Sequence, residues 1–365
     1  MTQPESSAAF DPTLVAGRDI ELGLDTFGDM SVGADGRPTP AAQVIRDVVE
    51  QAVLADSLGV DSIGLGEHHR DDYAISAPDI VLAAIAGETG RIRLGSAVTV
   101  LSSDDPIRVY ERFATLDAVS RGRAEVVLGR GSFTESFPLF GFDLADYEML
   151  FDEKLGLFAA LRAEAPVNWS GRHRSPLHDQ RVYPETESGG GLTTWIGVGG
   201  SPESVVRSVR HQIPMMLAII GGAPGRFGQY VELYRRAQVE LADETGQTRP
   251  LPLGAHSPGH LADTDEQALD EYWPYYRAMN DRIGRERGWP PATKDKLIAE
   301  AISGSQYVGS PETVATRIAA TARTLGLTRF DLKYSSGPMP HSMLLRSIEL
   351  YGSVVIPRVR ELLSR

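Results

Sequence analysis

The segment 91–133 constrains the fold most, because it contains a complete strand, helix and second strand. Leu94–Leu101 is a nearly continuous apolar run of strand length, as expected of a strand buried on both faces. Pro106 begins a segment with apolar residues at helical spacing, and Arg121-Gly122 ends it. Ala124–Leu128 is a second buried strand. Two parallel strands joined by a helix predict an α/β sheet with its chemistry at the carboxyl ends of the strands.

The same alternation continues along the chain. Further strands are predicted at 20–26, 62–65, 194–198, 214–220, 251–255 and 330–334, and helices at 40–58, 78–88, 146–163, 203–209, 227–241, 310–325 and from 343. Eight strands followed by helices predict a closed (β/α)8 TIM barrel. We expect one domain over 19–360, after a disordered N-terminal tail at 1–18, with insertions at about 164–193 and 283–305. The second insertion is rich in glycine, proline and charge, which favours a mobile lid.

The composition excludes several classes of function. The chain has 365 residues, of which 36 are basic and 49 acidic, and no basic block interrupts this balance. A formal net charge of −13 therefore argues against nucleic acid or an anionic membrane as a partner. The absence of cysteine excludes disulfides, thiolate metal sites and a cysteine nucleophile. No apolar run reaches roughly 18 residues and the start is polar, so we expect a cytoplasmic protein.

Two turns at predicted strand ends are suited to a phosphate. In Gly129-Arg130-Gly131-Ser132 the guanidinium is free to make paired bonds, and the glycines let a ligand approach the backbone. In Gly199-Gly200-Ser201-Pro202 a serine N-cap and a proline at the first helical position leave free N–H groups at a positive helix terminus. The alternatives are a tight turn with a surface arginine and an ordinary capped helix.

The segment 67–72, EHHRDD, follows the second predicted strand and combines histidines with carboxylates. Adjacent histidines on a strand point to opposite sides, which makes it difficult for both to bind one metal ion. A single histidine that donates a proton or a hydrogen bond is therefore favoured, and no metal ligand is assigned. The alternative is a metal-dependent barrel hydrolase, whose further ligands would be His256, His260 and Asp331.

In combination, several motifs resemble the bacterial luciferase-like flavin-dependent monooxygenases. They are GEHH (66–69), the segment 91–131, WIGVGGSPES (195–204), IPMMLAIIGG (213–222) and VGSPETVA (308–315). The resemblance implies an α/β barrel with insertions that uses reduced FMN, bound or as a cosubstrate, and O₂. The family oxygenates a small organic substrate through a C4a-peroxyflavin. It also implies a homodimer, with a separate flavin reductase as a candidate partner.

The resemblance also assigns roles to residues. His68 would be the catalytic acid or base, oriented by Glu67 or His69. The isoalloxazine would lie against Ala97, Val98 and Thr99, where the family often has a non-prolyl cis peptide, here Ala97-Val98. The cofactor-binding residues at the phosphate end would be Arg130, Gly131, Ser132, Gly199, Gly200 and Ser201. The apolar residues that could line the substrate pocket are Phe27, Tyr73, Phe133, Phe137 and Ile219.

Two departures from luciferase mean that light emission is not implied. This chain has Gly129 where luciferase has a cysteine, and Gly200 where luciferase has a glutamate. Two other functions also remain open within the superfamily. One is a deazaflavin-dependent enzyme that transfers hydride without oxygen, and the other is a non-catalytic flavin-binding protein.

Overall fold

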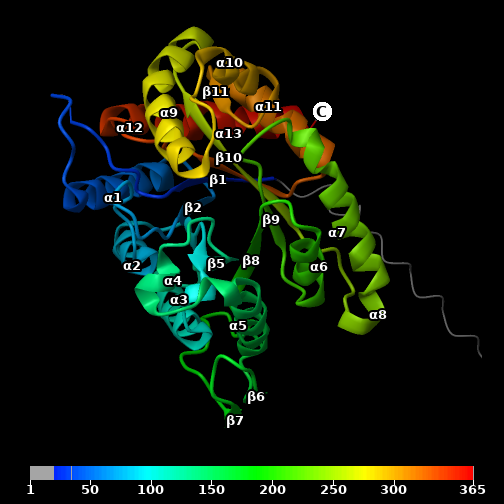
Figure 1. Ribbon diagram of the computed structural model, residues 1–365. Helices are drawn as coiled ribbons and strands as arrows, with labels where there is room; N and C mark the ends of the chain where they lie inside the picture. The colour runs from blue at the N-terminus through cyan, green and yellow to red at the C-terminus, as the bar shows by residue number, and fades with distance from the viewer. Residues whose placement is uncertain (1–19, 34, 365) are drawn as a thin grey trace, which may run out of the picture.

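The computed structural model describes residues 20–33 and 35–364 (Figure 1). Its parallel sheet has the strand order β3-β2-β1-β12-β10-β9-β8-β5-β4. These strands are β1 (Glu21–Thr26), β2 (Ser62–Leu65), β3 (Arg93–Ser96), β4 (Thr99–Val100), β5 (Glu125–Gly129), β8 (Thr193–Val198), β9 (Met215–Ala218), β10 (Leu253–Leu261) and β12 (Arg329–Lys333). A parallel bridge between Leu94 and Ala124 joins β3 to the strand region of β5 and closes the ring. The predicted TIM barrel is confirmed.

The strand predicted at 94–101 is divided into β3 and β4. The peptide bond between them, Ala97-Val98, is cis, as the resemblance implied. Leu101 no longer belongs to the strand, because it begins a short 3-10 helix, η1 (Leu101–Ser103). β3 and β4 thus occupy one barrel position between β2 and β5, which accounts for the eight strands predicted.

Helices follow the barrel strands as the alternation predicts. They are α1 (Ala41–Ser57), α2 (Pro78–Glu88), α3 (Pro106–Ser120), α5 (Tyr147–Leu161), α6 (Pro202–Arg210), α7 (Gly228–Glu240), α11 (Pro311–Leu325), α12 (His341–Leu350) and α13 (Ile356–Ser364), with the π-turn η4 (Tyr351–Val355) between the last two. Local caps set several of the starts. The Asp105 side chain accepts the N–H of Ile107 at 2.9 Å, and that of Ser201 accepts the N–H of Ser204 at 3.3 Å.

The insertion predicted at 164–193 contains a hairpin. Its antiparallel strands are β6 (Val167–Trp169) and β7 (Leu177–Gln180), and they form a separate two-stranded sheet. Figure 1 shows this hairpin at the opposite end of the molecule from α9 and α10. The remaining short elements are α4 (Ser136–Phe140), η2 (Leu144–Asp146), η3 (Pro224–Phe227), α8 (Ala242–Thr245) and β11 (Tyr307–Gly309). Of these, β11 pairs with β10.

The insertion predicted at 283–305 is more regular than its composition suggests. Residues 283–287 complete α9 (Asp265–Arg287), and most of the rest forms α10 (Lys294–Ser303). Gly288 ends α9 with a φ of +69°, and the Thr293 side chain accepts the N–H of Lys296 at 3.2 Å to begin α10. The glycine and proline signals therefore mark only the connection at 288–293.

The barrel interior contains a buried group of charges. The Arg329 side chain, 2% exposed, forms ion pairs with Glu125 at 2.6 Å and Asp331 at 2.9 Å. Its guanidinium carbon lies 5.4 Å from the centre of the Trp195 ring. Burial raises the pKa of Asp331 to about 6, although Arg329 opposes this shift.

Two predictions concern the ends of the chain and the membrane. The tail expected at 1–18 lies outside the described residues. Among the described helices, none combines the length and the apolar character needed to cross a bilayer.

Candidate active site

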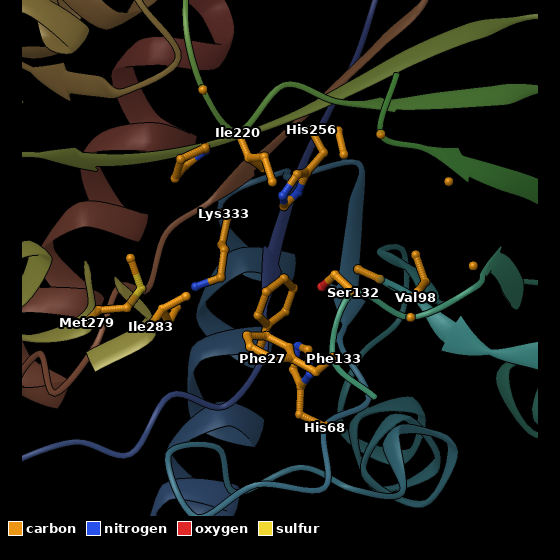
Figure 2. Close-up of a pocket in the computed structure, with 18 of the residues that line it drawn as sticks. Phe27, His68, Val98, Ser132, Phe133, Ile220, His256, Met279, Ile283 and Lys333 are labelled. Carbon is orange, nitrogen blue, oxygen red and sulfur yellow. The ribbon is translucent and has the colours of Figure 1, made fainter. Parts of the chain in front are cut away.

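A cavity of about 710 Å³ opens where the barrel strands end at their carboxyl side. Its wall includes Asp25 near the end of β1, His68 after β2, and His256 within β10. Figure 2 shows Val98 and Ser132 on one side of the cavity and Met279 and Ile283 of α9 on the other. The size and the largely apolar wall are typical of a site for an organic ligand.

The structure brings most of the predicted site residues to this wall. Those that line the cavity are His68, Ala97, Val98, Arg130, Gly131, Ser132 and Gly199. Thr99 lies behind the wall, where its hydroxyl donates a hydrogen bond to Ser96 Oγ at 2.9 Å. Gly200 and Ser201 belong to the turn that starts α6 and are not part of the wall. Of the apolar candidates, Phe27, Tyr73 and Phe133 line it, whereas Phe137 and Ile219 are buried elsewhere.

The cis peptide segment forms a supported apolar floor. Val98 packs against Val127, Trp195 and Met216. A Cβ at Gly129 would lie 2.4 Å from Val98 Cγ2, so this position has no space for a side chain. The glycine that replaces the cysteine of luciferase therefore makes room for Val98.

Arg130 already binds an oxyanion in this structure. Its guanidinium pairs with the Glu148 carboxylate, which also lies 3.6 Å from Arg207. Nearby, a Cβ at Gly199 would meet no atom within 4 Å, so the backbone there is open to a ligand. Gly131 has a φ of +79°, which favours glycine and keeps this turn free of side-chain bulk. The two guanidiniums hold a carboxylate here, and the same donors are suited to the anionic oxygens of a phosphate.

His68 is enclosed by aromatic rings. Its imidazole stacks on Tyr73 with ring centres 4.4 Å apart, and it meets the edges of Phe27 at 4.7 Å and Phe133 at 5.3 Å. Burial lowers the pKa of His68 to about 3, so the ring is neutral at physiological pH.

The residues predicted to orient His68 have other partners. Glu67 pairs with His69 at 3.0 Å and accepts the N–H of Val100 at 2.9 Å. Glu67 therefore fixes the segment of the cis peptide, while aromatic packing sets the position of His68.

Arginines fasten the C-terminal end of α9 over the cavity. Arg70 forms ion pairs with Asp72 at 2.9 Å, Glu135 at 2.5 Å and Glu286 of α9 at 2.7 Å. Arg287 donates to the carbonyl oxygen of Ser132 at 2.9 Å. The end of α9 is thus linked to both the histidine segment and the arginine turn.

This network predicts a local effect of Arg70→Met. We expect hydrogen exchange in the last turns of α9 to rise about 10- to 100-fold, because bonds to charged groups contribute about 1.5–3 kcal/mol. Exchange in the barrel strands should change little. Arg277→Met is the matched control, since Arg277 makes an exposed i,i+4 pair with Asp281 on the same helix. Equal exchange in the two variants would show that Arg70 does not hold α9.

Sequence reasoning missed the cavity residues of α9 that precede the predicted lid, and it missed Lys333 of β12. Figure 2 shows Lys333 on the cavity wall beside Phe27. The motif RFDLK alternates charged and apolar residues at period two, which places Arg329, Asp331 and Lys333 on one face of a buried strand. This alternation in the sequence could have predicted that charged side chains point into the barrel.

The metal alternative has no matching cluster in the described part of the chain. There, three potential ligands come close enough for one ion only at Asp47, Glu50 and His341. None of these residues lines the cavity.

The fold and the cavity define an α/β-barrel enzyme with its site at the carboxyl ends of the strands. The family model described as luciferase-like monooxygenase matches residues 27–329, and the chain belongs to this family. The predicted resemblance is confirmed, and with it an oxidoreductase that incorporates oxygen. A relative named 4-hydroxyprotoasukamycin monooxygenase, from Streptomyces nodosus subsp. asukaensis, is 26% identical and aligns with 87% of this chain and 88% of its own length.

Solved structures have the same fold. Monooxygenase RslO1 from Streptomyces bottropensis has a TM-score of 0.78 at 23% identity, covering 93% of this chain and 99% of its own. The oxygenating constituent of 3,6-diketocamphane monooxygenase from Pseudomonas putida, in complex with FMN, has a TM-score of 0.71 at 19% identity, with coverage of 93% and 99%. An F420-dependent secondary alcohol dehydrogenase has a TM-score of 0.70 at 15% identity, with coverage of 94% and 99%.

Proposed function

We propose that this protein is an FMN-dependent monooxygenase that oxygenates a small organic substrate inside the cavity. The observation that carries the proposal is the oxyanion site at Arg130, placed at one end of a cavity that has His68 on its wall. When bound, reduced FMN supplies two electrons for the activation of O₂, so that one oxygen atom enters the substrate and the other leaves as water.

The residues present fit a flavin phosphate at one end and a flat ring system at the other. Arg130 would exchange the Glu148 carboxylate for the phosphate, with Gly199 and Gly131 allowing close approach. The isoalloxazine would lie against Ala97 and Val98. Thr99, Gly200 and Ser201 would act indirectly, by supporting the floor and the start of α6.

Charge around the phosphate end favours FMN over a deazaflavin. Exposed carboxylates of Glu148 and Asp152 pair with the arginines there, and Glu203 lies at the start of α6. The cofactor F420 extends beyond its phosphate with further carboxylates, and like charges repel. FMN ends at the phosphate and carries none of these additional carboxylates. Hydride transfer with a deazaflavin is the second candidate, because an F420-dependent enzyme has the same fold.

The chain contributes orientation, a dry site and proton handling. His68, neutral within its aromatic enclosure, is able to accept a proton at its imidazole nitrogen or share a hydrogen bond with the reacting groups. Tyr73, Phe27 and Phe133 exclude water from this side. α9 and α10 cover the other side, consistent with the proposed lid. A homodimer, a cytoplasmic location and a separate flavin reductase remain predictions.

Arg130→Gln tests the cofactor site directly. We expect FMN to bind about 10- to 100-fold more weakly, because a charge-assisted bond to the phosphate is lost. Riboflavin, which lacks the phosphate, should bind the variant and the wild type equally. Both affinities are measured by quenching of flavin fluorescence.

The matched control is Arg358→Gln, which removes an arginine paired with Glu312 and Glu361 on the surface. This variant should bind FMN as the wild type does. An equal loss of FMN and riboflavin affinity in Arg130→Gln would contradict a phosphate contact, and unchanged FMN affinity would remove Arg130 from the site.

A further inference from the structure

A second histidine lies on the cavity wall, with a carboxylate behind it. His256 Nδ1 is 2.6 Å from Asp25 Oδ2, and the Asp25 side chain is 1% exposed. The imidazole stacks on Phe27 at an interplanar angle of 14°, with ring centres 6.3 Å apart. Figure 2 shows His256 and His68 on opposite sides of Phe27. The proposed flavin contacts do not use this arrangement.

The carboxylate fixes which nitrogen of His256 remains for a ligand. Because Asp25 accepts at Nδ1, the proton on that nitrogen is held in place. No hydrogen bond joins Nε2 to any residue within 20–33 or 35–364. The side chain is 13% exposed and lines the cavity. Nε2 is therefore the nitrogen available to a molecule bound there.

The charges around His256 favour its protonated form. Burial lowers the pKa of His256, whereas the charge and the hydrogen bond of the adjacent Asp25 raise it, and the net result is a pKa above its usual value. From β12, Asp331 raises the pKa of His256 further and Lys333 lowers it. The buried Asp25 carboxylate, 2.6 Å from Nδ1, stabilises the imidazolium, in which Nε2–H is a charged hydrogen-bond donor.

We propose that His256 determines substrate specificity by donating a hydrogen bond from Nε2 to the carbonyl oxygen of an apolar ketone. The remaining wall suits the apolar part of such a molecule, since Ile220, Met279 and Ile283 face the cavity. A charged donor on the wall of a buried cavity disfavours a ligand that leaves it unpaired, so a hydrocarbon of the same shape would bind poorly. This inference rests on the proposed function, because it takes the ketone to be the substrate that the enzyme oxygenates.

The test compares 1-tetralone with tetralin, which has the same rings without the carbonyl group. In the wild type we expect 1-tetralone to bind at least about 10-fold more tightly than tetralin. The infrared carbonyl band of ¹³C=O-labelled 1-tetralone should move to lower wavenumber than in heptane, which a merely structural histidine would not cause. Both measurements are made on the full chain, without FMN and with oxidised FMN.

The variants isolate the donor. His256→Phe keeps a ring on Phe27, and the double variant His256→Phe/Asp25→Asn also removes the buried charge that would otherwise lose its partner. Both should bind the two probes equally and show an unshifted carbonyl band. His341→Phe is the control, because His341 bonds to Gln51 outside the cavity, and it should retain the wild-type preference.

Several results would overturn the inference. They are equal binding of the two probes by the wild type, an unshifted band, a preference that persists in folded His256 variants, or no binding of 1-tetralone. If the wild type prefers 1-tetralone but does not bind FMN, the result would count against the proposed cofactor and not against His256. If the wild type binds FMN but does not prefer 1-tetralone, the result would count against His256 alone.

Discussion

His68→Ala is expected to lower the rate of substrate oxygenation by about 10²- to 10⁴-fold, the range typical of a lost general acid or base. The affinity for FMN should stay close to that of the wild type, because Arg130 pairs with Glu148 whereas the His68 ring packs against the aromatic rings around it. The rate is measured as ¹⁸O transferred from ¹⁸O₂ to a panel of ketones, with reduced FMN supplied chemically.

The matched control for this prediction is His341→Ala, which replaces a histidine outside the cavity. It should retain the full rate. Full activity in His68→Ala would exclude the proton-handling role. Loss of FMN affinity in parallel with the rate would assign His68 to binding instead.

The environment of His68 also predicts a dependence of stability on pH. The folded chain holds the pKa of His68 near 3, whereas the unfolded chain takes up a proton near the usual value of 6.5. The unfolded state therefore binds more protons between these values, and His68 makes the protein less stable as the pH falls through this window. Urea unfolding of His68→Leu should show a smaller loss of stability on acidification than the wild type. An identical loss in both proteins would contradict the low pKa.

Arg329→Met is expected to reduce the free energy of unfolding by about 3–5 kcal/mol, because removal of one partner leaves buried charges uncompensated. Asp331 and Glu125 both pair with this guanidinium, although Glu125 also lies 3.5 Å from Arg93, and the two carboxylates are almost completely buried. The pKa of Asp331 is already raised to about 6 by burial, and without Arg329 it should rise further. The loss should therefore be largest above pH 6 and smaller in acid, where the folded state holds the proton.

Two variants make this result interpretable. Arg358→Met removes an exposed arginine with two carboxylate partners and should cost less than about 1 kcal/mol. The triple variant Arg329→Met/Glu125→Gln/Asp331→Asn removes all three charges and should recover much of the stability. A small loss for Arg329→Met at every pH, measured by urea unfolding, would contradict the account of this cluster.

The sequence was sufficient for the barrel because each strand is a short buried run next to a capped helix. β2 and α2 have the predicted bounds, since all four residues of Ser62–Leu65 are buried and Pro78 starts the helix. The division of the strand at 94–101 does not follow from periodicity. The family resemblance located it, since the pattern of apolar residues is the same for cis and trans peptide bonds.

The site residues that directly follow barrel strands were predictable from the sequence. Arg130 and His68 belong to short motifs that directly follow predicted strands, and both reach the cavity. The contributions of α9 were not predictable, because its cavity face depends on how Arg70 and Glu286 fasten the helix over the barrel. Tertiary contacts of this kind leave no local pattern. The partner of Glu67 was missed for the same reason, since Val100 meets it only across the fold.

The most direct test of the central claim is a parallel anaerobic titration of the protein with reduced FMN and reduced F420. We predict that FMN binds with one equivalent per chain and that F420 binds at least about 10-fold more weakly, because its additional carboxylates would bring more negative charge near Glu148 and Asp152. Tighter binding of F420 than of FMN would contradict the proposed monooxygenase and identify a hydride-transfer enzyme of the same fold.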